Sequence, residues 1–144
     1  MGSTTTIEYR TLPDTRAAVG RAGTHSVIAD RPEGRHGGLG LGFNGGELLA
    51  LAIGGCFCND MQAIADQMGI EIADLAVSVT IDFTDQPSRA ARARMEVNCR
   101  LADESDSSEL IERAKGLTTI ANSLSAGVPV SIETVRPALS GGDG

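Results

Sequence analysis

The sequence predicts an α+β fold in which one long buried helix is covered by strands and by a second helix. Residues 47–68 are mostly apolar or small, and their apolar side chains point in several directions around a helical axis, which is typical of a buried helix. Two later stretches, 75–83 and 91–101, alternate apolar and polar residues, which predicts strands with one buried face. Apolar residues at helical spacing over 106–124 predict the second helix.

Composition limits the functional classes. With 144 residues, 22% of them charged and 41% hydrophobic, the chain is expected to form one domain over 1–144, with about 1–5 and 139–144 disordered. A net charge of −7 and few aromatic residues argue against nucleic-acid binding, which needs clustered cations or stacking surfaces. Acidic and amide side chains interrupt the apolar run of 47–68, so no membrane span is expected.

Cysteine and histidine usage limits the chemistry further. The three cysteines are an odd number, and no signal peptide is recognised, which together predict free thiols in a reducing cytoplasm. His25 and His36 have no partner at metal-ligand spacing, so neither a metal nor another cofactor is expected.

Three short strands are predicted before the long helix, at 7–12, 16–21 and 24–30. Gly20-Arg21-Ala22-Gly23 joins the second and third of them, and glycine on both sides favours a hairpin turn there. The glycine-rich stretch 31–46 lacks the pattern of a phosphate-binding loop and is expected to be a flexible approach to the helix.

The ends of the two helices carry local signals. Asn44 is a candidate N-terminal cap of the long helix, and Gly69 is expected to end that helix in a left-handed conformation. Asp106, followed three residues later by Glu109, predicts the start of the second helix. Gly127 is expected to close it.

The strands after the long helix are expected to form an antiparallel hairpin. The turn is predicted at 84–88, which contains a proline, and the apolar face should cover the long helix. A last strand is predicted at 128–135, after the second helix.

Five short motifs, in this order and at this spacing, resemble those of the OsmC/Ohr superfamily. The resemblance spans roughly 19–133, and the motifs are Gly37-Gly38 to Asn44, Glu47-Leu48-Leu49-Ala50, Gly54-Gly55-Cys56, Asn122-Ser123-Leu124 and Gly127-Val128-Pro129-Val130. The resemblance implies an intertwined homodimer in which a curved antiparallel sheet wraps a long central helix. Peroxidase members of the superfamily reduce organic hydroperoxides with a peroxidatic cysteine in the central helix and a resolving cysteine in the later one. In those members an arginine and a glutamate stabilise the thiolate and orient the peroxide.

The superfamily's functional positions are partly kept in this chain. The resemblance implies that Cys56 is the peroxidatic cysteine and that Arg21 is the activating arginine. Thr118 stands where the resolving cysteine belongs, and threonine cannot form a disulfide. The glutamate falls on Gly46, and the neighbouring Glu47 lies about 180° round the helix from Cys56, at ~100° per residue, so it cannot simply substitute.

Each of these residues also has a structural interpretation. A cysteine in a buried helix is often a small apolar residue, and Arg21 is equally explained as a solvated turn residue. Asp60, one turn after Cys56, disfavours a thiolate unless an arginine offsets it; otherwise it is a buried polar residue paired across a dimer. Cys58 lies about 200° round the helix from Cys56, and Cys99 belongs to the apolar face of its strand, so both are expected to be structural.

Two functions are consistent with these residues. In the first, the Cys56 thiolate attacks the distal oxygen of an organic hydroperoxide and forms a sulfenic acid, which an external thiol must reduce because Thr118 cannot. In the second, a non-catalytic homodimer binds a small organic ligand in its interface cleft. The rate of Cys56 alkylation against pH separates them, because a reactive thiol supports catalysis and an inert thiol supports binding.

Overall fold

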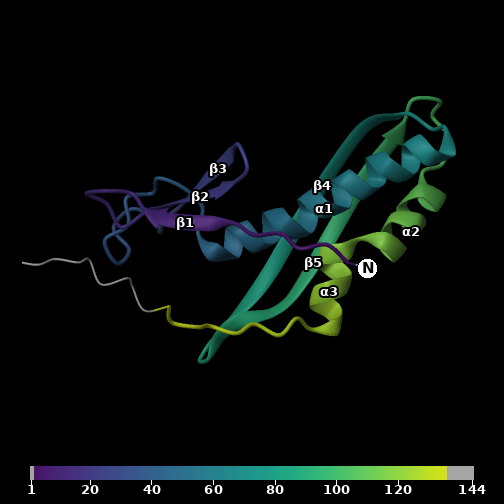
Figure 1. Cartoon of the computed structure of the whole chain (residues 1–144). Coiled ribbons are helices and arrows are strands. Elements are labelled where there is room, and N and C mark those ends of the chain that lie inside the picture. Colours follow the sequence, from purple (N-terminus) through teal and green to yellow (C-terminus); the bar gives the residue numbers. More distant parts are fainter. Residues whose placement is uncertain (1, 136–144) are drawn as a thin grey trace, which may run out of the picture.

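The computed structural model describes residues 2–135. Within that range the elements are β1 (Glu8–Thr11), β2 (Ala18–Ala22), β3 (His25–Ala29), α1 (Gly45–Met68), β4 (Ile72–Asp85), β5 (Ser88–Leu101), α2 (Ser108–Leu117) and α3 (Thr119–Ala126). Figure 1 shows α1 lying across the β4–β5 hairpin, α2 and α3 beside it, and the strands β1–β3 near its N-terminal end. The predicted α+β class is confirmed, and the disorder predicted for 139–144 lies outside the described residues.

Both predicted ends of α1 are confirmed. Asn44 Oδ1 accepts a hydrogen bond from the Glu47 backbone N–H at 2.9 Å, and Glu47 Oε1 accepts one from the Asn44 N–H at 3.0 Å. This reciprocal capping box satisfies two N–H groups that a helix start leaves unpaired. The helix begins at Gly45, two residues earlier than predicted, and Gly69 ends it with a φ of 67°, a conformation that glycine adopts without strain.

The long helix α1 forms the centre of the larger part of the molecule. It contacts β4, α2 and α3. The largest fully buried side chains are Phe57, Met61, Leu101 and Leu110. A Cβ at Gly54 would lie 3.1 Å from Val79 Cγ2, so glycine permits the close approach of helix and strand. By length and composition alone α1 could cross a membrane, but these contacts identify it as the core helix of this fold.

The β4–β5 hairpin is longer than predicted, and the predicted alternation of burial is confirmed over 75–81 and 95–101. Phe83, Ala91 and Ala93, which were expected on the buried face, are exposed near the tip of the hairpin. Its ladder continues to the pair Asp85–Ser88, so only Gln86 and Pro87 form the turn, and the expected turn over 84–88 is wrong at its edges. The extra pairs form because the backbone N–H and C=O groups near the tip still find partners on the opposite strand.

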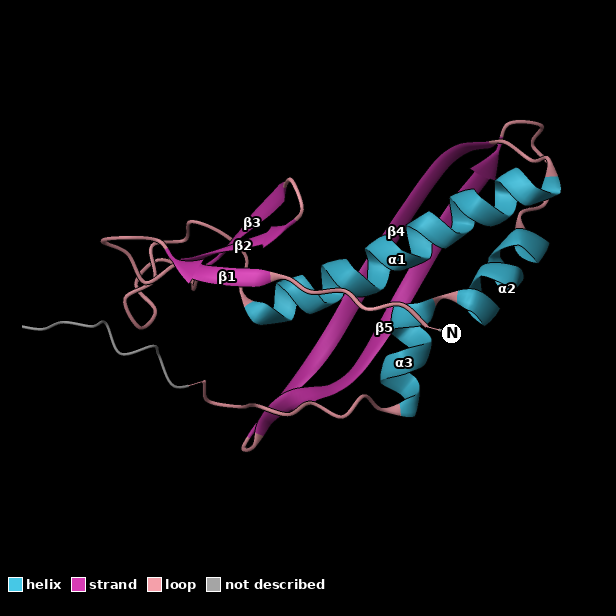
Figure 2. Cartoon of the chain, in the orientation of Figure 1, coloured by secondary structure: helices cyan, strands magenta, loops and turns pink. Residues whose placement is uncertain are grey.

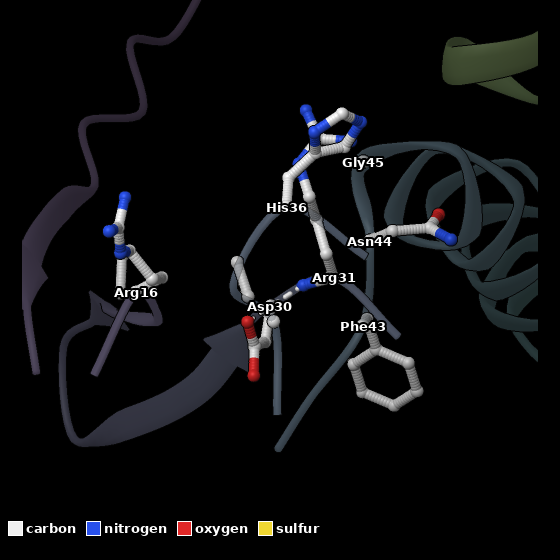
Figure 3. A pocket seen from close by; sticks show the side chains of 10 residues that line it. Arg16, Asp30, Arg31, His36, Phe43, Asn44 and Gly45 are labelled. Atoms are coloured by element: carbon white, nitrogen blue, oxygen red, sulfur yellow. Dashed lines mark hydrogen bonds between the residues drawn. The ribbon is translucent and has the colours of Figure 1, made fainter. Parts of the chain in front are cut away.

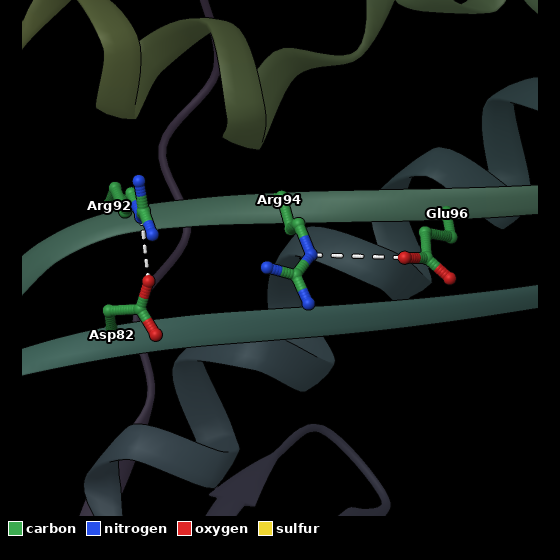
Figure 4. A network of polar contacts seen from close by, with 4 residues as sticks. All are labelled: Asp82, Arg92, Arg94 and Glu96. Carbon is green, nitrogen blue, oxygen red and sulfur yellow. Dashed lines mark hydrogen bonds and ion pairs between the residues drawn. The ribbon is translucent and has the colours of Figure 1, made fainter.

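Charged side chains pair on the exposed surface of this hairpin (Figure 4). Asp82 Oδ2 lies 2.6 Å from Arg92 Nε across the two strands, and Arg94 Nε lies 3.8 Å from Glu96 Oε1 along β5. All four side chains are about half exposed or more, so these pairs are worth little stability, about 0–1 kcal/mol each.

The strands β1, β2 and β3 form a separate antiparallel sheet in that order. The predicted hairpin is present, but its turn lies at Gly23, which has a φ of 61°, and not across Gly20 to Gly23. Gly20 belongs to β2, where it pairs with Tyr9 of β1, and the Tyr9 ring covers it; a Cβ at this position would lie 2.6 Å from that ring. Arg21 is consequently a strand residue, paired with Glu8 and Ser26.

The single helix predicted over 106–124 is wrong, because the chain breaks into α2 and α3 at Thr118. Its ψ of 105° is extended, and the Asn122 side-chain amide donates to the carbonyls of Lys115 and Gly116, at 3.4 and 3.3 Å. The predicted start of the second helix is close to the observed one, but the capping box is not formed. α2 begins at Ser108 with Ser107 as its N-cap, and Asp106 Oδ1 accepts hydrogen bonds from the Ser108 N–H and hydroxyl without a return bond from Glu109, which pairs with Arg113.

The strand predicted at 128–135 is not formed. Within the described residues no strand lies alongside this segment to pair with its backbone, and Figure 2 shows it as an extended loop. Its apolar side chains remain outside the core, and Ile132 is 95% exposed. A strand needs a neighbour to satisfy its N–H and C=O groups, and residues 2–135 do not supply one.

Candidate functional site

Cys56 lies in the middle of α1 with two polar neighbours. Its Sγ lies 3.7 Å from Asp60 Oδ2, one helical turn further along α1, and 3.9 Å from Thr118 Oγ1. The cysteine is a free thiol and is half-buried. Residues four apart lie on the same face of a helix, so the Cys56–Asp60 contact follows from spacing alone. The contact with Thr118 joins residues 62 positions apart and depends on the fold.

The break between α2 and α3 brings Thr118 to Cys56. Thr118 ends α2, where its N–H donates to Ala114 O, and it starts α3, where its carbonyl accepts from the Asn122 N–H. Its side chain is 3% exposed. The residue expected at the superfamily's resolving position therefore contacts the residue expected at the peroxidatic position, although it carries a hydroxyl in place of a thiol.

Arg21 and Glu47 are not brought to Cys56 within one chain. Arg21 is exposed on β2, which lies near the N-terminal end of α1 (Figure 1), and it lines an apolar hollow of about 240 Å³ with Tyr9. Glu47 is held in the capping box. At the superfamily's glutamate position, a Cβ on Gly46 would lie 2.8 Å from the Phe83 ring, so a side chain there requires that ring to move.

The other two cysteines have separate surroundings. Cys58 is half-buried and lines a second hollow, and Cys99 packs against the core cluster around Met61. Burial raises the pKa of the Cys99 thiol above its ordinary value, with a smaller contribution from the charge of Asp74, while a hydrogen bond with Ser107 opposes the rise. This environment supports the structural interpretation of Cys99, since a thiol with a raised pKa is a poor nucleophile near neutral pH.

The hollow beside Cys58 is an open apolar face of α1. It has a volume of about 590 Å³ and includes Leu51, Gly55 and Val77 in its lining. Leu51 is 53% exposed, although it belongs to the core helix. An apolar surface of this kind on a central helix usually marks an interface or a ligand site.

A second polar centre, which the sequence analysis missed, lies at Asp30. Its carboxylate accepts backbone hydrogen bonds from Arg31 at 2.8 Å, Leu39 at 3.1 Å and Leu41 at 3.0 Å. These donors hold the pKa of Asp30 below its ordinary value of 3.8, the Leu41 N–H having the largest effect and burial opposing it. The loop predicted to be flexible is therefore tied to a buried carboxylate. The signal was an aspartate just before a glycine-rich segment, where such side chains bind nearby N–H groups.

Basic side chains line a hollow beside this carboxylate (Figure 3). Arg16, Arg31 and His36 line a hollow of about 360 Å³ together with Asp30 and Phe43. In the figure Arg31 and His36 extend away from the Asp30 carboxylate, which is already occupied by its three N–H donors. Among residues 2–135 no group of three or more metal-ligating side chains is found.

Comparisons with known proteins agree with this architecture. The family model described as OsmC-like protein matches residues 36–133. An OsmC like protein from Mycoplasma pneumoniae has a TM-score of 0.72 and 17% identity, covering 87% of this chain and 89% of that chain. No curated protein sequence matches the chain.

Two solved structures whose descriptions name organic hydroperoxide resistance are also similar to this chain. The organic hydroperoxide resistance protein OsmC from Legionella pneumophila has a TM-score of 0.58 and 16% identity, with 83% of this chain and 88% of that chain covered. The organic hydroperoxide resistance protein OhrB of Bacillus subtilis has a TM-score of 0.56 and 18% identity, with 83% and 89% covered. At these identities the likeness concerns the fold. Because the family model spans more than half of the chain, the protein belongs to the OsmC-like family.

Proposed function

We propose that this protein reduces organic hydroperoxides through Cys56, with an external thiol as the reductant. The observation that carries the proposal is the setting of Cys56, a half-buried thiol at the superfamily's peroxidatic position with Asp60 and Thr118 against its sulfur. In the proposed reaction the sulfur attacks the distal peroxide oxygen and the O–O bond breaks. An alcohol leaves, and Cys56 becomes a sulfenic acid. The two similar structures described as organic hydroperoxide resistance proteins support this reaction class.

An external thiol is needed because no second cysteine lies against Cys56. Thr118 occupies the resolving position, and the Cys99 thiol packs into the core cluster. Reduction then proceeds when a small thiol attacks the sulfenic acid, releases water and forms a mixed disulfide, which a second thiol breaks.

The proposed active form is an intertwined homodimer. Two features support it: the open apolar face of α1 around Leu51, and a β1–β3 sheet that has no main contact with a helix of its own chain. For Arg21 to act on Cys56 it would have to do so from a second copy, because β2, which carries Arg21, lies near the N-terminal end of α1 in its own chain (Figure 1). A cation there would favour the thiolate.

Peroxide consumption tests the proposal directly. We expect the protein to consume cumene hydroperoxide in the presence of dithiothreitol, and Cys56→Ser to abolish the reaction. Cys58→Ser is the matched control, because Cys58 is on the same helix and equally half-buried, and it should keep the activity. Without a thiol, mass spectrometry should find a sulfenic or more oxidised Cys56. A clean Cys56–Cys99 disulfide, or no consumption with any thiol, would contradict the proposal.

The second candidate function is binding of a small organic ligand without turnover. The apolar hollow of about 590 Å³ beside Cys58 favours it, because ligand pockets of this size are mostly apolar. Saturable binding of an apolar fluorescent dye to a protein that consumes no hydroperoxide would favour this function over catalysis.

A further inference from the structure

The polar contacts of Cys56 include a carboxylate, that of Asp60, which stands at neither of the positions expected for the superfamily's arginine and glutamate. We propose that Asp60 takes the thiol proton of Cys56 as the sulfur attacks, and that Thr118 donates a hydrogen bond to that sulfur. This inference rests on the proposed function and names the base and the hydrogen-bond donor of the same site. Asp60 then promotes the reaction of Cys56, in contrast to the expectation that its charge only disfavours the thiolate.

Geometry supports this division of roles. Asp60 Oδ2 is 3.7 Å from the Cys56 sulfur, and Asp60 is half-buried, so the carboxylate is near both the thiol and solvent. Thr118 Oγ1 approaches the same sulfur from a different element at 3.9 Å and is 3% exposed. Thiols are weak hydrogen-bond donors and sulfur is a weak acceptor. Contacts of this length therefore hold the carboxylate and the hydroxyl near the sulfur without binding the thiol tightly before it reacts.

No other charge in the described part of the chain contacts Cys56. Of the elements packed on α1, α3 has no ionisable side chain, and the charged residues of α2 form exposed pairs with one another, Arg113–Glu109 and Lys115–Glu112. On β4, Asp74 acts on Cys99 and Asp82 pairs with Arg92. Within one chain, the Asp60 carboxylate is thus the ionisable side chain that is bonded to the thiol.

The proposed step balances in protons and electrons. The thiol proton passes to the Asp60 carboxylate while the Cys56 sulfur forms a bond to the distal peroxide oxygen. The O–O bond breaks, the sulfur is oxidised by two electrons and the peroxide is reduced by two. The departing alkoxide takes a proton from the Asp60 carboxyl group and leaves as an alcohol, which restores the carboxylate. General base catalysis of this kind contributes about 10²–10⁴-fold in other enzymes.

The rate of Cys56 alkylation by iodoacetamide against pH tests the base role without needing peroxide. The measurement uses a Cys58→Ser background, so that mass spectrometry of the peptide reports one thiol. If Asp60 accepts the proton, wild-type reactivity should persist between about pH 6 and 8, whereas Asp60→Asn should be about tenfold slower or more at pH 6. At pH 9 and above the variant should equal or exceed the wild type, because free thiols ionise there (ordinary pKa about 8.5) and the repelling charge is gone.

If the carboxylate only repels the thiolate, the opposite result follows. Asp60→Asn would then react faster than the wild type at every pH, and this outcome overturns the inference. Asp66→Asn, the same change at an exposed position of the same helix, is the matched control and should leave the profile unchanged. Circular dichroism of each variant separates a chemical effect from unfolding.

The Thr118 role is tested with a nearly isosteric pair. Thr118→Val removes the hydroxyl and should slow alkylation by a similar factor, a few-fold, at every pH, while Thr118→Ser should restore the rate. Equal rates for the Val and Ser variants would remove Thr118 from the inference. Peroxide consumption by the same proteins separates the two proposals. If the pH profiles of the wild type and Asp60→Asn cross but no peroxide is consumed, the base role of Asp60 is retained and the proposed peroxidase activity is rejected.

Discussion

The two halves of α1 differ in how completely one chain covers them. In the second half, Phe57 and Met61 are fully buried against β5 and α2, in a cluster that includes Leu101 and Leu110. In the first half, Leu51 is 53% exposed and faces an open hollow. Both halves are apolar in sequence. One chain therefore builds a complete core around only part of its central helix.

The two sheets differ in the same way. β4 packs against α1, whereas β1, β2 and β3 make their main contacts with one another. The apolar segment 128–135 likewise has no strand partner among the described residues. These surfaces are explained together if a second copy covers the first half of α1, as in the homodimer proposed above, because exposed apolar surface of this extent is costly in water.

The largest expected effect is at the buried half of α1. Phe57→Ala should destabilise the protein by about 3–5 kcal/mol, because it leaves a cavity in a close-packed cluster. Urea unfolding followed by circular dichroism measures this. Leu51→Ala is the matched change on the open half. At concentrations where the protein is monomeric, it should lower the free energy of unfolding much less than Phe57→Ala does. Equal costs for the two variants in the monomer would contradict the comparison.

The next effect concerns association and not folding. Leu51→Asp should dissociate the proposed homodimer, because an unpaired carboxylate in an apolar interface is strongly unfavourable. Sedimentation velocity at micromolar concentration should show a dimer for the wild type and a folded monomer for the variant. Ala102→Asp, at an exposed position after β5, should remain dimeric. A wild-type protein that sediments as a stable monomer would remove the idea that a second copy covers this face.

Sequence predicted the features that depend on local signals. The capping pair Asn44 and Glu47 and the terminal Gly69 act within a few residues of chain, and the alternation over 95–101 reflects one face packed on the core cluster. Hydrogen-bonding and glycine preferences at these places need no distant contact. The position of Cys56 on the central helix followed from the same helix assignment.

The features that were missed depend on distant partners. The apolar spacing runs through Thr118 without interruption, and the break is fixed by the Asn122 amide and by packing on Cys56. The turn at Gly23 was misplaced because the Tyr9 ring, which covers Gly20, belongs to another strand. The segment 128–135 has a strand's sequence but no partner strand in the part of the chain that the structure describes, so periodicity alone could not decide its structure.

The smallest expected effect is at Asp30, in the loop that connects the β1–β3 sheet to α1. Asp30→Asn should lower the thermal unfolding midpoint near pH 7 by less than Phe57→Ala does, because an amide replaces one of the two carboxylate oxygens with a donor that faces N–H groups.

The pKa of Asp30 is lower in the folded protein than its ordinary value of 3.8, so the carboxylate's contribution to the stability of the fold is fully present above that pH. It is lost as the pH falls through the lower folded pKa. The difference between wild type and variant should therefore shrink below about pH 3.8, in thermal unfolding measured across a series of pH values. Glu33→Gln, in the same loop and exposed, should show no such convergence. If Asp30→Asn unfolds at the wild-type temperature at pH 7, contacts other than those of this carboxylate hold the loop.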